Sequence, residues 1–256
     1  MSVELALQFV PTFVLAFFRV AGMMLAAPFF GNARVPRRIR LMLALVLTVG
    51  FLPGIGPVRM PDSTWLLAAG IAGEMLFGLA IGTVLNFAFM AVQWAGEIIS
   101  QQLGLGLGEM YDPQFGQGGS VVSDLYFLLT LVIFLSLQGH HAFLRGVRAT
   151  FDSLPLLSVG MSQGLLDLAV RLLASATNLA MQLAAPMLVT MLLVDVVLGF
   201  VGKTIPQINV MTAGLSLRSL VGIVVMILGL ALTGEVIAGF LKETVKALGE
   251  AWAAPI

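Results

Sequence analysis

Long apolar stretches separated by short breaks dominate the pattern of this sequence. Runs without Asp, Glu, Lys or Arg occupy residues 5–18, 20–33, 41–58, 75–96, 125–144, 172–194 and 219–234. Pro53 and Pro57 shorten the third run to about 41–52, and Arg19 divides the first two. Because a membrane-spanning helix needs about 20 apolar residues, the pattern predicts about six helical segments, several of them short or broken.

The breaks between these runs are rich in Gly and Pro. Proline removes a backbone donor and glycine permits tight turns, so we predict loops or helix breaks at 31–36, 53–63, 104–119, 152–164 and 203–214. No connection is long or polar enough to divide the chain. The expected architecture is therefore all-α, a membrane-associated bundle that forms a single domain over residues 1–256.

Composition restricts the class of protein further. Of the 256 residues, 59% are hydrophobic and only 10% are charged, against about 25% charged in a typical soluble domain. This excludes a cytosolic enzyme, a disordered tail and a nucleic-acid-binding module, and the 13 basic and 13 acidic side chains balance. Glu4 is the only charge before Arg19, so the start lacks the positive region of a cleaved signal peptide and we expect it to remain. An integral membrane protein, or a subunit buried in an apolar assembly, is left.

Charge gives a conflicting membrane topology. The densest basic cluster consists of Arg34, Arg37, Arg38 and Arg40, and the positive-inside rule places it in the cytoplasm. Six alternating spans would then place Arg145 and Arg148 outside. We therefore expect helical hairpins that need not all cross a bilayer.

Five charged residues lie within or beside the apolar segments: Arg19, Glu74, Glu97, Asp195 and Glu235. A lone charge at the bilayer centre costs at least about 2.5 to 3.5 kcal/mol. They could form a proton relay, pair with each other or with neighbouring subunits, or lie at segment ends. Because they are scattered one per segment rather than grouped, we favour polar contacts between subunits for Arg19, Glu97, Asp195 and Glu235.

Small residues repeat along one predicted helix. Gly70, Glu74, Gly78 and Gly82 recur every four residues and so share a face that another backbone can approach closely. The face is either an assembly surface or an ordinary packing surface within the chain, and GxxxG alone does not distinguish the two.

The central segment 104–120 is the most informative local stretch. Its glycines preclude a stable helix, and non-helical backbone between two apolar segments is tolerated only inside protein or beside a wet cavity. It is either a plain connection or a loop that closes a pore and can be displaced. The residues we assign to such a plug are Gly104, Gly106, Gly108, Met110, Tyr111, Phe115, Gly116, Gly118 and Gly119.

We predict no catalytic, cofactor or metal site. The glycine pattern lacks the following Lys and the strand–helix context of a nucleotide loop. His140 and His141 are adjacent, so they do not share a helix face and make a poor metal pair. There is no Cys, and no Ser/His/Asp or paired-carboxylate arrangement has suitable spacing.

Several stretches together resemble one family, that of the flagellar biosynthesis protein FliR and its relatives in virulence type III secretion. They occur in the family's order and cover nearly the whole chain: Ala27-Pro28 through Val35-Pro36-Arg37-Arg38-Ile39-Arg40 and on from Leu41; Glu74 through Gly82; Ala95-Gly96-Glu97 through Asp112-Pro113; Gly139-His140-His141; and Ala185-Pro186 through Gly199 to Pro206-Gln207-Ile208-Asn209-Val210. The Gly-His-His and Pro-Gln-Ile-Asn stretches look more flagellar than injectisome-like.

The resemblance implies a structural subunit of a protein export gate. A FliP-like part would be followed by a FliQ-like part, and FliP-like and FliQ-like subunits would complete the gate. FlhB-like and FlhA-like export components, unfolded protein substrates and lipid would be further partners. The gate would lie in the bacterial inner membrane at the flagellar basal body and protrude to the periplasmic side, with the segment 104–120 as its plug. From the residues alone, a stand-alone secondary transporter using Glu74, Asp195 and Glu235 is the alternative, and a membrane enzyme comes last.

Overall fold

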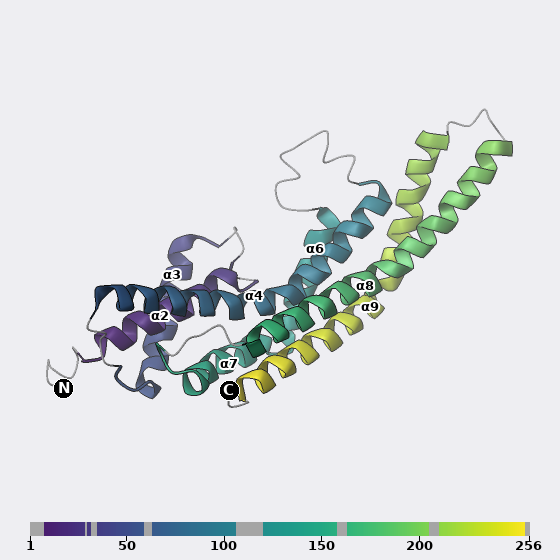
Figure 1. Cartoon of the computed structure of the whole chain (residues 1–256). Helices are drawn as coiled ribbons and strands as arrows, with labels where there is room; N and C mark the ends of the chain where they lie inside the picture. The colour runs from purple at the N-terminus through teal and green to yellow at the C-terminus, as the bar shows by residue number, and fades with distance from the viewer. Residues whose placement is uncertain are drawn as a thin grey trace. The chain divides into compact units, whose positions relative to one another are not determined.

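The computed structural model describes residues 8–28, 30–31, 35–58, 63–105, 120–157, 163–204 and 210–253. Within these ranges the regular structure is helical, without strands: α2 Val10–Ala26, α3 Arg37–Phe51, η1 Leu52–Gly54, α4 Thr64–Leu103, α6 Val121–Ser136, α7 Gly139–Ser153, α8 Gln163–Thr204 and α9 Val210–Ala253 (Figure 1). The all-α class that the apolar pattern predicts is confirmed.

The chain divides into two compact units. Unit 1 comprises Met1–Phe87, Gln138–Leu173 and Glu243–Ile256, and unit 2 comprises Ala88–Leu137 and Ala174–Lys242. The long helices α4, α8 and α9 each contribute one part to each unit. That the whole chain works as one domain stays a prediction.

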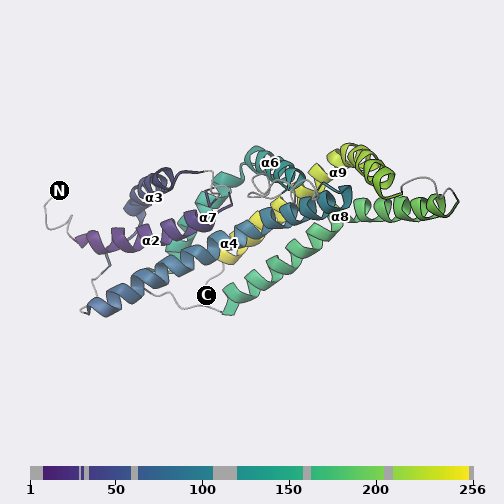
Figure 2. The same cartoon turned by 90° about the horizontal axis from the view of Figure 1, so that it is seen from above.

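Unit 1 is built around α2. In both views α2 lies along the first part of α4, and α3 packs on α2 (Figures 1 and 2). Leu15, Ala16, Val20 and Met23 of α2 have no exposed surface. A run of apolar side chains at helical spacing therefore buries one stripe of α2, as expected of a helix that faces a core.

Unit 2 contains the last part of α4 with α6 and the apolar parts of α8 and α9. Its centre is aromatic: the ring of Phe89 lies 5.8 Å from that of Phe127 and 5.5 Å from that of Phe134, between ring centroids. These separations fall in the range that favours tilted and edge-to-face packing. The aromatic contact joins α4 to α6.

The helices differ from the charge-free runs at several boundaries, since α4, α8 and α9 continue through Glu74, Asp195 and Glu235. Arg19 does not divide a helix, because α2 runs through it from Val10 to Ala26. The predicted segment 125–144 is instead interrupted: α6 ends at Ser136, α7 begins at Gly139, and Gln138 between them has φ 55°. The boundary predicted at Arg19 is wrong because a helix can continue through a charged residue when another helix provides its partner.

Three helices in the described ranges are long and apolar enough to cross a membrane: Thr64–Leu103, Ala169–Thr204 and Gly214–Ala247. The broken pair α6 and α7 would make a fourth. The conflict in charge topology predicts that not every apolar segment crosses the bilayer. The number of full spans agrees with that prediction. Together with the helical architecture, these spans make the protein a membrane-embedded bundle.

Candidate functional site

A buried ion pair lies at the centre of unit 1. The Arg19 Nε donates to Glu74 Oε2 at 2.5 Å, and neither side chain has exposed surface. The Arg19 Nη1 also donates to the carbonyl oxygens of Thr150, at 3.0 Å, and Leu154, at 2.9 Å. The other Glu74 oxygen, Oε1, accepts from the backbone N–H of Leu157 at 2.9 Å.

Two aromatic rings flank the guanidinium. The Arg19 Cζ lies 5.0 Å from the ring centroid of Phe77 and 4.8 Å from that of Phe151, within the range of cation–π attraction. Removing two charges from water costs several kcal/mol per ion, which is recovered only when further hydrogen bonds satisfy them. The cluster supplies such bonds to Arg19 Nε and Nη1 and to both Glu74 oxygens, and it ties α2, α4 and α7 together. The buried Arg19 Nη2 has no hydrogen-bond partner among the described residues.

Arg19 is therefore paired within this chain, and the polar contact between subunits that we predict for it stays a prediction. Its recorded partners belong to this chain, and the alternative in which the charges pair with each other describes Arg19 and Glu74. The pair bridges 55 positions in sequence.

The glycine face of α4 packs against α2 inside unit 1. A Cβ at Gly82 would lie 2.6 Å from the carbonyl oxygen of Met23, and a Cβ at Gly78 would overlap the carbonyl oxygen of Arg19. Gly22 of α2 packs against α4 in the same way, since a Cβ there would overlap the carbonyl oxygen of Met75. At Gly70 the added atom would meet a methyl group of Leu157. Glycines in both α2 and α4 thus let the two backbones pack closely. Packing within the chain is sufficient to explain the glycine face of α4.

The first end of the predicted plug is fixed by a helix terminus. Gly104 has φ +75°, its N–H donates to Gln101 O at 3.1 Å, and the Leu105 N–H donates to Ser100 O at 3.2 Å. This pair of bonds is the Schellman motif, which requires a left-handed residue and so favours glycine. The Ser219 hydroxyl of α9 donates to Leu103 O at 2.8 Å, which satisfies another terminal carbonyl.

The second end returns to the same part of α4. The Ser120 hydroxyl accepts from the Ser123 N–H at 3.1 Å and caps α6, while Glu97 Oε2 accepts from the Ser120 N–H at 3.4 Å. A Cβ at Gly96 would lie 2.6 Å from the Ser123 Cα. Glu97 therefore has a partner in this chain. We name the loop base the bonds of Gly104, Leu105 and Ser120 to α4 together with the bond between Leu103 and Ser219 of α9.

The other residues assigned to the plug lie outside the described residues: Gly106, Gly108, Met110, Tyr111, Phe115, Gly116, Gly118 and Gly119. Their role stays a prediction.

The remaining predicted charges lie in unit 2. Asp195 of α8 accepts from Arg218 Nε of α9 at 2.7 Å and also pairs with Arg218 Nη2. The two side chains are 40% and 36% exposed, respectively. Glu235 is exposed on α9. Contacts of Asp195, Glu97 or Glu235 with another subunit stay predictions.

Most of the apolar surface of α8 and α9 is uncovered in this chain. In the most apolar stretch of each helix, only 17% of α8 residues and 11% of α9 residues are buried, compared with 56% in α4. Large exposed side chains continue along α8 to Phe200, which is 69% exposed, and along α9 through Leu228, which is 75% exposed. Contiguous apolar surface of this extent marks contact with lipid or with other proteins.

Comparison with known proteins decides the family. A family model described as "Bacterial export proteins, family 1" matches residues 10–244. The chain belongs to this family.

Relatives within it are similar over most of their length. The flagellar biosynthetic protein FliR of Aquifex aeolicus is 32% identical over 227 residues, 88% of this chain and 87% of that protein. FliR of Bacillus subtilis is 29% identical, with 93% of each chain covered. The surface presentation of antigens protein SpaR of Shigella flexneri is 26% identical, with 82% of this chain and 81% of that protein covered.

The resemblance to FliR that the ordered stretches indicate is thereby confirmed. This export protein is a membrane-embedded component of a flagellar or type III export system. Flagellar relatives predominate among these similar proteins, while SpaR shows that the likeness extends beyond them.

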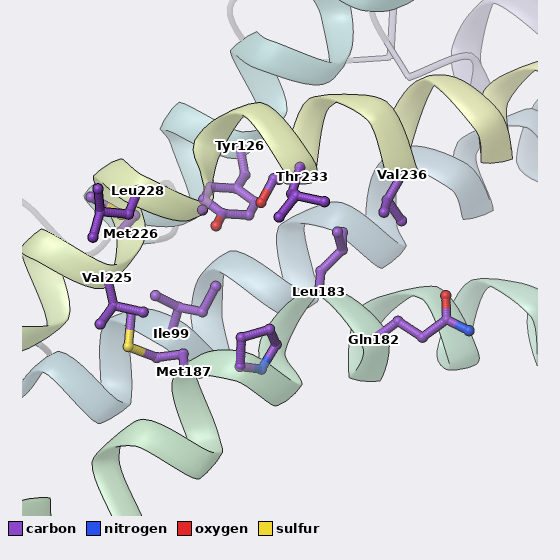
Figure 3. Close-up of a pocket in the computed structure, with 13 residues that line it drawn as sticks. Ile99, Tyr126, Gln182, Leu183, Met187, Val225, Met226, Leu228, Thr233 and Val236 are labelled. Atoms are coloured by element: carbon purple, nitrogen blue, oxygen red, sulfur yellow. The ribbon is translucent and has the colours of Figure 1, made fainter.

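An apolar pocket of about 460 Å³ in unit 2 was not predicted from the sequence (Figure 3). It is lined by Ile99, Tyr126, Gln182, Leu183, Pro186, Met187, Val225, Met226, Leu228, Gly229, Leu232, Thr233 and Val236. Nothing lies within 4 Å of a Cβ placed on Gly229, so the missing side chain leaves part of this space. The pocket has no carboxylate in its wall, which makes it unsuited to cation or proton transfer.

No group of three potential metal ligands occurs in the described ranges. His140 and His141 lie with ring centroids 4.2 Å apart at the start of α7. The close backbone approaches at Gly22 and Gly96 are not predicted from the sequence, because they depend on which backbone packs against each glycine.

Proposed function

We propose that this family member is a structural subunit of the type III flagellar export gate, in which it lines and plugs the export channel together with FliP-like and FliQ-like subunits. The observation that supports this most is the uncovered apolar surface of α8 and α9. A chain that leaves so little of these helices buried needs an environment that covers them. Part of that environment is lipid, and the rest is neighbouring subunits.

The ion pair on this surface favours protein over lipid as the local cover. Asp195 and Arg218 are both more than a third exposed, while neighbouring Leu192 and Val196 are exposed at 63% and 50%. Ionisable side chains within membrane segments normally face a bundle interior or a wet cavity. A subunit interface or the water-filled side of a channel provides such surroundings.

The plug proposal rests on the loop base. Both ends of the segment 104–120 are held by contacts with the last turns of α4, by the Schellman motif at Gly104 and by the Glu97–Ser120 bond. We propose that the plug leaves the pore while these anchors stay in place, so that α4 and α6 need not unwind. Glycines lower the steric cost of such alternatives, and Met110, Tyr111 and Phe115 supply the bulk that blocks a pore.

The remaining partners follow from the same proposal. FlhB-like and FlhA-like export components act beside the gate, unfolded protein substrates pass through it, and no nucleic acid takes part. The gate lies in the bacterial inner membrane at the flagellar basal body and protrudes to the periplasmic side. Its role is structural rather than enzymatic.

No contact of the candidate transport carboxylates supports a stand-alone solute transporter. Glu74 is buried and engaged by Arg19 and Leu157, and Asp195 is paired with Arg218. The apolar pocket of unit 2 has no carboxylate in its wall.

Deleting residues 106–118 from the assembled complex tests the plug. We expect ion conductance across a planar bilayer to rise while the complex still assembles, because both anchors of the loop base remain. A second variant keeps the length and replaces Met110, Tyr111 and Phe115 with Ser, and it should also leak. Conductance equal to that of the intact complex in both variants would rule out the plug role but not the gate role.

A further inference from the structure

The first turn of α3 joins positive charge to apolar surface. Arg37 and Arg38 are exposed and Arg40 is half-buried, and no acidic residue lies in this turn. Among the described residues Arg37 and Arg38 form no ion pair. The N-terminal end of a helix adds its own partial positive charge.

A pocket lies directly beside this charge, between α2 and α3. Its volume is about 160 Å³, and it is lined by Ala21, Met24, Leu25, Arg37, Arg40, Leu41 and Ala44. The two arginines and the apolar side chains thus share one wall. The space is smaller than the roughly 300 to 1,000 Å³ of a small-molecule site, so it suits part of a larger amphipathic molecule.

The rest of α3 is uncharged and carries exposed apolar side chains. Beyond the arginines, residues 41–51 carry no charge, and Met42 and Val46 are 67% and 69% exposed. Eleven helical residues span about 16 Å, about half of the roughly 30 Å hydrocarbon core. A charged end followed by one leaflet's depth of apolar surface matches the headgroup and acyl chain of a phospholipid.

We propose that the pocket between α2 and α3 binds an anionic phospholipid. Arg37 holds the headgroup phosphate through guanidinium N–H groups, whose fork geometry suits phosphate oxygens. Arg40, whose Nη2 donates to Val35 O at 3.3 Å, adds its positive charge beside the phosphate. The first part of an acyl chain lies against Met24, Leu25 and Leu41. Basic pockets between membrane helices recognise anionic headgroups in this way. The proposal depends on membrane embedding and not on the plug.

The test is a lipid titration of the purified export complex in neutral detergent, followed by native mass spectrometry. Dioleoylphosphatidylglycerol should bind at least tenfold more tightly than dioleoylphosphatidylcholine. Each basic contact near a membrane surface is worth about 1 kcal/mol, or about fivefold in affinity. Arg37→Gln should therefore weaken phosphatidylglycerol binding about fivefold and leave phosphatidylcholine binding unchanged.

Neighbouring residues of α3 provide matched controls. Arg38→Gln removes the same charge in the same turn but outside the pocket wall, and it should cost less than twofold. Leu41→Ser changes the apolar wall and should weaken both lipids, whereas Met42→Ser, also exposed but outside the wall, should not. All four positions are exposed, so the variants should fold like the native chain.

Three results would overturn the proposal. Equal losses for Arg37→Gln and Arg38→Gln would mean diffuse charge rather than a pocket. Equal affinity for the two lipids would remove headgroup recognition. If inorganic phosphate at the same concentration displaced phosphatidylglycerol completely, the site would be one for a free anion and not for a lipid.

Discussion

At the scale of single residues, Arg19 and Glu74 form the buried ion pair of unit 1. The pair has no exposed surface, and its hydrogen bonds reach carbonyls at Thr150 and Leu154 and the N–H of Leu157. Because nearly every polar atom has a partner, the pair fixes where α7 and its following turn meet α2 and α4. The free-energy cost of breaking it arises from the charge that is left behind rather than from the bond itself.

Glu74→Gln should destabilise the protein by about 3 to 5 kcal/mol, because it leaves the Arg19 guanidinium buried without a carboxylate. The double substitution Arg19→Met with Glu74→Leu should recover most of this loss. Thermal unfolding of the complex in detergent, followed by tryptophan fluorescence, measures both. Asp195→Asn breaks a half-exposed pair and should cost less than about 1 kcal/mol. A single substitution no worse than the double one would contradict this explanation, because the buried charge left behind would then cost nothing.

At the scale of elements, the contact between α2 and α4 depends on glycine in both helices. Gly78 and Gly82 face backbone atoms of Arg19 and Met23, and Gly22 faces Met75. Backbone atoms cannot move aside as a flexible side chain does, so any larger residue must separate the helices. The same separation would break the Arg19–Glu74 pair, which links the two effects.

Gly78→Leu should cost about 3 kcal/mol or more through overpacking, and Gly73→Leu is its control. Nothing lies within 4 Å of a Cβ at Gly73, and leucine favours the helix over glycine by somewhat under 1 kcal/mol. Thermal unfolding and the yield of complex report on both. If Gly78→Leu or Gly82→Leu gave a normally stable chain that no longer co-purified with FliP-like and FliQ-like subunits, the face would be an assembly surface after all.

At the scale of the whole molecule, the distribution of burial is uneven. More than half of the apolar stretch of α4 is buried, but less than a fifth of those of α8 and α9. Without partners, the chain gains little free energy from burying the apolar surface of α8 and α9. Its folded state and its assembly should therefore be linked, since partners that bind only the folded chain stabilise it.

The chain purified alone should form mixed aggregates in detergent, whereas co-expression with FliP-like and FliQ-like chains should give one discrete complex. Size-exclusion chromatography with light scattering distinguishes the two cases. A monodisperse lone chain that moves a solute into liposomes would contradict the gate and restore the transporter.

Sequence reasoning located the elements because its signals are local. Apolar transfer energy, summed over about 20 residues, identified the long helices, and Gly or Pro identified the breaks around 104 and 53. The charge of Arg19 inside an apolar run predicts a helix boundary, but α2 continues through it. Sequence reasoning also missed the interruption after Ser136, where Gln138 adopts a left-handed conformation without a glycine or proline at that position.

The sequence by itself determined the membrane class, the family and the position of the central segment, because composition and ordered motifs do not depend on the fold. Only the tertiary structure decided which charges meet and which glycines touch a neighbour. Arg19 finds Glu74 across 55 positions and Thr150 across 131. No periodicity within a helix encodes a partner at that separation, since the choice is made by helices packing and removing water from both groups together.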